Sequence, residues 1–190
     1  MQIQQYLQQY LGIPTRQLEK IAALFEPEQL EKGDFWLRQG QYNGRMSFLS
    51  AGYMHFHAPS PHNGKSITQW IGSPGAVIAD LATLLSQAPA RWNIEALNPC
   101  QLHTISEDNY RKIDQLIPEW PLLEKNFLAR CFMTLEERVF NLLSLTAEQR
   151  YQALWNQDAD LFNQVPLQYL ASMMHMTPET LSRILSLIHI

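Results

Sequence analysis

The end of the chain, residues 165–190, constrains the fold more than any other segment. Its sequence, VPLQYLASMMHMTPETLSRILSLIHI, predicts a short helix over about 166–174, a sharp turn at His175 and a second helix. Thr177 suits the N-cap of that second helix and Pro178 suits its first position, because the cap hydroxyl satisfies a free backbone N–H and proline has none to lose. The pattern is typical of a helix-turn-helix.

The two helices are expected to pack on one shared apolar core. Ala171 is small enough for a close crossing, and the apolar positions at helical spacing are Leu170, Met173, Met176, Leu181 and Ile184. Such a pair commonly places its second helix in the DNA major groove. The polar residues left facing outward on that helix are Glu179, Thr180, Ser182, Arg183 and Ser186.

Composition limits the class of protein. The 190 residues are 46% apolar and 11% aromatic, which predicts a real core in one large domain, or in one medium and one small domain. The net charge of −4 argues against indiscriminate nucleic-acid binding, which needs a basic surface. Residues 165–190 hold only one arginine, Arg183, and one carboxylate, Glu179, so electrostatic support for DNA binding is weak.

The expected location is the cytoplasm. No apolar run approaches the ~20 residues that span a bilayer, so no membrane partner is expected, and the N-terminus lacks the pattern of a signal peptide. Cys100 and Cys131 form no CxxC pair, and they are interpreted as isolated buried thiols. No metal site and no catalytic group at motif spacing is predicted.

The first half of the chain changes character near residue 27. Helical spacing of apolar residues runs to about residue 25. Seven of the eight glycines then fall within 27–106, between short alternating segments. This spacing predicts a small β-barrel or roll. Its expected parts are strands at 34–37, 47–49, 53–56, 66–70, 92–96 and 100–106, a hairpin tip at 59–64 and a helix at 78–85.

A long helix is predicted to follow Pro118 and Pro121 and to reach about residue 145. Its apolar residues lie on more than one side, so we expect it to pack on the roll and on a second copy of itself in a parallel homodimer. The alternative is a core helix of a monomer. A connecting helix is expected from Thr146 to about Trp155.

The order of these parts resembles the Crp/Fnr family of bacterial transcription regulators, and most closely a Bacteroidetes-like branch. The resemblance covers nearly the whole chain. The segments that carry it are KGD at 32–34 with Gly40, the turn at Gly52, residues 74–80, IEAL at 94–97 and ETLSRIL at 179–185.

The resemblance implies an α+β fold. It consists of an N-terminal double-stranded β-helix, a cyclic-nucleotide-binding-like jelly roll, in a sensor domain over 1–117, a dimerisation helix over 118–145 and a helix-turn-helix domain over 146–190. It also implies DNA with a palindromic operator, a second copy of the chain and RNA polymerase as partners, and a small effector in the roll.

Four residues match the family's ligand-binding cassette, in which backbone N–H groups and an arginine hold a phosphate. They are Ile78, Ala79, Asp80 and Arg91. Asp80 stands where the family has a ribose-binding glutamate, and Ala79 replaces a glycine. Arg91 lies one residue beyond the arginine position, which on a strand would turn it to the other face, so a surface or structural ion pair is favoured. The cofactor stays unknown, and these departures argue against canonical cyclic AMP binding.

The family's base-reading positions fall at Pro178, Glu179 and Arg183. Glu179 can accept from cytosine N4, and Arg183 can donate to guanine O6 and N7. Phosphate contacts are expected from Gln168, Thr177 and Thr180. The alternative for Glu179 and Arg183 is an ordinary i,i+4 surface pair.

Two other functions remain open. Residues 185–190 are apolar where the family continues with basic residues and a β-wing, so the wing is absent or truncated, or DNA binding has decayed in favour of a ligand-sensing or protein-interaction module. A cupin-like metal-dependent enzyme is the remote alternative, because His55 and His57 alternate on one strand. With no third ligand at short spacing, these histidines are interpreted as residues of a solvent-exposed strand face.

Overall fold

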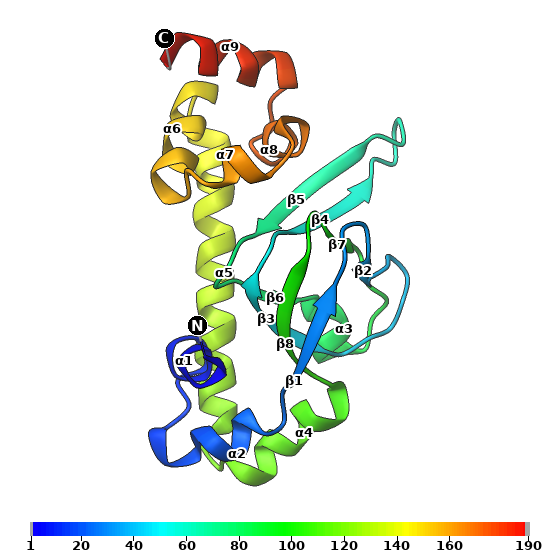
Figure 1. Cartoon of the computed structure of the whole chain (residues 1–190), viewed down its shortest axis with the longest axis vertical. Helices are drawn as coiled ribbons and strands as arrows, with labels where there is room; N and C mark the ends of the chain where they lie inside the picture. Colours follow the sequence, from blue (N-terminus) through cyan, green and yellow to red (C-terminus); the bar gives the residue numbers. More distant parts are fainter. Residues whose placement is uncertain (1, 189–190) are drawn as a thin grey trace.

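The computed structural model describes residues 2–188. A β-roll lies beside the long helix α5 (Trp120–Ser144), with the N-terminal helices against one end of α5 and the C-terminal helices at the other (Figure 1). This arrangement confirms the predicted α+β fold. No helix within the described part of the chain is long and apolar enough to cross a membrane.

The roll consists of two four-stranded sheets whose strand pairs are all antiparallel, in the orders β1-β8-β3-β6 and β2-β7-β4-β5. Side chains such as Trp36, Met54 and Ile94 fill the space between the sheets because alternate residues of each strand point inward. The strands are β1 (Glu26–Leu30), β2 (Phe35–Leu37), β3 (Met46–Ala51), β4 (Met54–Pro59), β5 (Ser66–Gly72), β6 (Val77–Ala79), β7 (Asn93–Ala96) and β8 (Cys100–Ile105).

The predicted helix at 78–85 is wrong at its start. Val77–Ala79 form strand β6, which pairs with β3, and the helix α3 covers only Leu81–Ser86. The apolar spacing of residues 78–85 is compatible with a helix. Pairing with β3 is favoured at the start of this segment because it satisfies the backbone hydrogen-bonding groups of the fully buried Ile78. Asp80 caps α3, and its Oδ1 accepts hydrogen bonds from the backbone N–H groups of Ala82 and Thr83.

A second core joins the N-terminal helices to the base of α5. Tyr6 and Trp120 are almost fully buried in it, together with Ile113 of helix α4. Helix α4 was not predicted from the sequence, although Ser106 caps it and acidic residues occupy its first turn. The helices of this region are α1 (Ile3–Tyr6), η1 (Leu7–Leu11), η2 (Thr15–Gln17), α2 (Leu18–Ala22) and α4 (Glu107–Leu116).

Helix α5 carries an exposed apolar stripe. Leu143 is 84% exposed, Phe132 69% and Phe140 62%. The other large apolar side chains exposed on this helix are Leu122, Met133, Leu135 and Val139. A large patch of this kind on one helix is typical of a protein interface rather than of a free surface.

The C-terminal helices share a third core. Thr146 opens α6 with a capping box completed by Gln149, and Leu170 and Leu181 are fully buried between α8 and α9. The short helix α7 was not predicted from the sequence. The helices are α6 (Ala147–Gln157), α7 (Leu161–Gln164), α8 (Leu167–Met173) and α9 (Pro178–Ile188). His189 and Ile190, the last residues of the apolar end, lie outside the described residues.

Candidate nucleic-acid interface and ligand pocket

Helices α8 and α9 form the helix-turn-helix pair, and the turn between them is built as the sequence predicts. His175 has a left-handed backbone with φ of 54°, and the N–H of Met176 donates to the Ala171 carbonyl at 2.9 Å. Thr177 caps α9, since its Oγ1 accepts from the N–H of Thr180 at 3.2 Å. These bonds fix the angle at which α9 leaves the turn.

The six residues predicted to touch DNA lie on the surface of this pair. Thr180 is half-buried, and the other five are exposed: Gln168, Thr177, Pro178, Glu179 and Arg183. The alternative ion pair between Glu179 and Arg183 does not form, and among the described residues the Arg183 guanidinium has no ion-pair partner. Arg183 is therefore free to reach a ligand.

The β4–β5 hairpin lies beside the predicted DNA-contacting residues. Lys65, Ser66 and Ile67 at its tip line one open groove with the segment 177–179 and with Gln168. The pKa of the Glu179 carboxyl is lowered by its own backbone N–H, by the Thr177 hydroxyl and by the charge of Lys65. Sequence reasoning placed a turn at this hairpin but had no signal that it meets the helix-turn-helix.

The body of the hairpin also contacts α8 directly. The backbone N–H of Thr68 donates to Ser172 Oγ at 2.9 Å, and the Tyr169 ring lies 4.2 Å from the His55 ring between centroids. The roll and the helix-turn-helix are therefore in direct contact, in addition to being joined by the chain between them.

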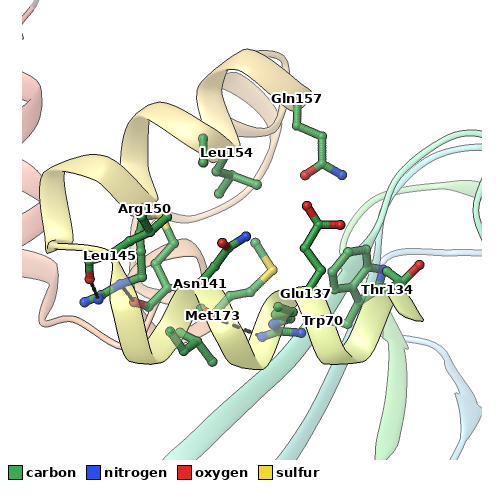
Figure 2. Close-up of a pocket in the computed structure, with 13 residues that line it drawn as sticks. Trp70, Thr134, Glu137, Asn141, Leu145, Arg150, Leu154, Gln157 and Met173 are labelled. Atoms are coloured by element: carbon green, nitrogen blue, oxygen red, sulfur yellow. Dashed lines mark hydrogen bonds between the residues drawn. The ribbon is translucent and has the colours of Figure 1, made fainter. Parts of the chain in front are cut away.

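The end of α8 also contacts α5 and α6, and these three helices surround a pocket of about 450 Å³. Figure 2 shows Glu137 of α5 and Gln157 of α6 pointing toward each other across it. Arg138 Nη2 donates to the Met173 carbonyl at 3.2 Å, and Arg150 Nε donates to the Met174 carbonyl at 2.8 Å. Two cations thus hold the C-terminal end of α8, where the helix dipole is negative.

The predicted ligand cassette lines a pocket between the roll and α5. Its volume is about 540 Å³, within the range of about 300–1,000 Å³ that is usual for small-molecule sites. Ala79, Asp80 and Arg91 line it, together with Trp70 and with Arg138 from α5. Burial lowers the pKa of the Arg138 guanidinium, because a charged group is less stable away from water.

Three of the four cassette residues therefore come together, and the fourth does not line the pocket. The Ile78 side chain is fully buried in the core between the sheets. Asp80 is 6% exposed, and its Oδ1 is occupied in capping α3. Arg91 precedes β7, so the alternation of a strand does not turn it away, and the ion pair expected for it is not found among the described residues.

The histidine pair differs from its expected place. Met54 and Phe56 point into the roll core, so His55 and His57 point to the outer face of the sheet, but α8 covers that face. The expected solvent exposure is wrong, because His55 is only 2% exposed. Cys100 is buried as expected, while Cys131 is half-buried.

The chain matches no protein-family model and no curated protein sequence. It is similar to the solved structure of FixK2 from Bradyrhizobium japonicum, with a TM-score of 0.73 and 15% identity over 87% of this chain and 84% of that one. It is also similar to CLP, a c-di-GMP responsive global regulator of Xanthomonas campestris, with a TM-score of 0.68 and 15% identity over 93% and 92% of the chains.

The catabolite activator protein of Thermus thermophilus matches with a TM-score of 0.59 and 19% identity over 97% of this chain and 86% of that one. The chain has the Crp/Fnr-type fold. These structures cover between 87% and 97% of this chain. At identities this low, the likeness establishes the fold, and the sequence prediction of a Crp/Fnr-type architecture is confirmed.

Proposed function

We propose that this chain is a dimeric, DNA-binding transcription regulator that reads a palindromic operator through α8 and α9. The observation that carries the proposal is a capped helix-turn-helix whose outward residues, Glu179 and Arg183 among them, are exposed and not paired with each other. The three solved structures described above, a catabolite activator and a global regulator among them, support the same function.

The dimer rests on the exposed stripe of α5. Full burial of a leucine or phenylalanine side chain stabilises by roughly 1.5–3 kcal/mol, so water-exposed Phe132, Phe140 and Leu143 favour a partner surface of the same kind. A second copy of α5 supplies that surface. A two-fold axis along α5 also gives two recognition helices, which a palindrome requires.

DNA recognition is assigned to two classes of residue. Arg183 and Glu179 read base edges, since an arginine can donate two bonds to guanine and a carboxylate can accept from cytosine. Pro178 has no polar side-chain group and contributes shape only. Gln168, Thr177 and Thr180 contact phosphates and set the register. RNA polymerase is proposed as a further partner of the DNA-bound dimer.

The pocket beside α5 is the proposed effector site. A ligand there would touch Arg91 and Asp80 of the roll and Arg138 of the dimer helix at once. Because Arg138 also donates to the Met173 carbonyl of α8, the same side chain faces both the effector pocket and the helix-turn-helix. A ligand in this pocket changes the affinity for DNA only if it binds more tightly to one position of the helix-turn-helix relative to α5 than to another.

The decisive experiment is selection of bound sequences from random duplex DNA by the full chain, at low and at moderate salt. The proposal predicts a palindrome whose half-sites are about 10 base pairs apart, because one turn of DNA separates the recognition helices of a two-fold dimer. Recovery of no enriched sequence at either salt, with a working control regulator in parallel, would contradict DNA reading by the chain alone.

The second candidate is a protein-interaction module without DNA binding. The low positive charge near α9, where Lys65 and Arg183 stand with Glu179, favours it. The salt series separates the two functions, because DNA binding weakens steeply as salt rises and apolar protein contacts do not.

A further inference from the structure

Three metal-ligating side chains meet on the outer face of the sheet β2-β7-β4-β5. His55 and His57 come from β4 and Glu95 from β7, and their potential ligand atoms all lie within 4.8 Å of one another. The register explains this proximity, since His55 stands directly opposite Glu95 in the β4–β7 pair and His57 lies two residues along on the same face. Spacing along β4 could not reveal Glu95 as a third ligand, because Glu95 belongs to another strand.

Each imidazole uses one ring nitrogen for a neighbouring hydroxyl. His55 Nε2 lies 2.8 Å from Thr68 Oγ1, and His57 Nδ1 lies 3.3 Å from Ser66 Oγ. When these nitrogens carry the proton and donate, the other nitrogen of each ring holds a free lone pair. Metal-bound histidines are arranged in this way, with the second nitrogen bonded to a neighbouring group that fixes the tautomer.

The spacing of His57 and Glu95 fits two ligands of one metal ion. His57 Nε2 is buried and has no hydrogen-bond partner among the described residues, yet it lies 3.3 Å from Glu95 Oε2. Two ligands of a tetrahedral zinc ion, with bonds of about 2.0–2.1 Å, are themselves about 3.3–3.4 Å apart.

We propose that His55, His57 and Glu95 bind one divalent transition-metal ion of the zinc class. Two imidazoles and one carboxylate are a known ligand set for such an ion, with a fourth position left for water. The side chains of Glu95 and His57 keep 29% and 16% of their surface exposed, which gives the ion a path inward. The Tyr169 ring contacts the His55 ring and so lies beside the site, where the roll meets α8.

The test is a titration of the tag-free, chelator-stripped full chain with Co²⁺, followed by visible absorption, and with Zn²⁺ in competition. We expect one ion per chain and a rise in melting temperature on adding Zn²⁺, because a ligand that binds only the folded state stabilises it. His57→Ala and Glu95→Gln should abolish both effects. His62→Ala, which changes an exposed histidine of the hairpin tip, is the matched control and should behave as wild type.

Thr68→Val keeps the fold and the ligands while removing the hydroxyl bonded to His55 Nε2. Loss of such an outer partner typically weakens metal affinity about 10- to 100-fold, and we expect a change of this size. The proposal is overturned if the wild type shows no saturable Co²⁺ binding, or if the well-folded Glu95→Gln and Thr68→Val variants bind Co²⁺ as tightly as the wild type.

Discussion

Arg150 Nε donates a 2.8 Å hydrogen bond to the Met174 carbonyl oxygen and so ties the connecting helix α6 to the end of α8. The same guanidinium donates through Nη1 to the Leu145 carbonyl at the end of α5. One side chain therefore links the three helices that meet at the pocket of Figure 2. Hydrogen bonds from a charged donor are stronger than neutral ones, and these satisfy carbonyl groups that helix ends leave free.

Replacing this arginine should loosen the helix-turn-helix from the long helix. We expect Arg150→Ala to lower the free energy of unfolding by about 1.5–3 kcal/mol, the usual worth of hydrogen bonds to a charged group. Urea denaturation followed by circular dichroism measures the change. Hydrogen exchange should rise first in α8, whose C-terminal carbonyl loses its partner.

The matched control for this change is Arg183→Ala, which removes the same charge from an exposed side chain without an ion-pair partner among the described residues. It should change the free energy of unfolding by less than about 0.5 kcal/mol. Equal destabilisation by both substitutions would show that net charge, rather than the carbonyl contacts of Arg150, sets the stability.

The stripe on α5 leads to a second prediction. Leu143→Glu should convert the proposed dimer to monomer, because a carboxylate would be buried opposite its own copy without a partner. Sedimentation velocity measures the change, and the melting behaviour at high dilution should differ little from wild type. Leu187→Glu, at a 70% exposed position of α9, is the control and should leave the dimer intact.

Most of the fold could be predicted from local sequence signals. The turn at His175, the Thr177 cap and the start of α6 at Thr146 follow from short-range chemistry that the sequence states directly. Strand β1 was missed because Pro27 and its charged neighbours suggest a loop, yet it forms an edge strand that pairs with β8. Its pairing depends on residues far along the chain.

In the candidate sites too, some residues could be predicted from local spacing and others could not. The six residues predicted to contact DNA share one helical pair, so their common surface could be predicted from spacing. The proximity of Lys65 to Glu179, and of Glu95 to His57, arises from packing between strands and helices distant in sequence. Arg138 was missed for this reason, since nothing in its neighbourhood on α5 reveals a pocket formed with the roll.

Two substitutions can distinguish the role of Asp80 as the cap of α3 from a role in binding an effector. Asp80→Ala should destabilise the chain by about 0.5–2 kcal/mol, because the N–H groups of Ala82 and Thr83 lose their cap. Asp80→Asn keeps an acceptor oxygen at the cap and should be nearly neutral in thermal unfolding. If the carboxylate also binds an effector, Asp80→Asn will lower effector affinity in calorimetry while stability stays unchanged. If it serves the cap alone, effector affinity will not change.

Arg183 provides the sharpest test of sequence reading by α9. Arg183→Ala should weaken binding to the selected operator by about 1–3 kcal/mol and relax the preference at one base pair of each half-site. Fluorescence anisotropy with operator and with single-base variants measures both effects. Thr177→Ala is expected to weaken binding to all sequences alike, as loss of a phosphate contact does, along with a weaker helix cap. Equal affinity of wild type and Arg183→Ala for the best operator would exclude base reading by this arginine.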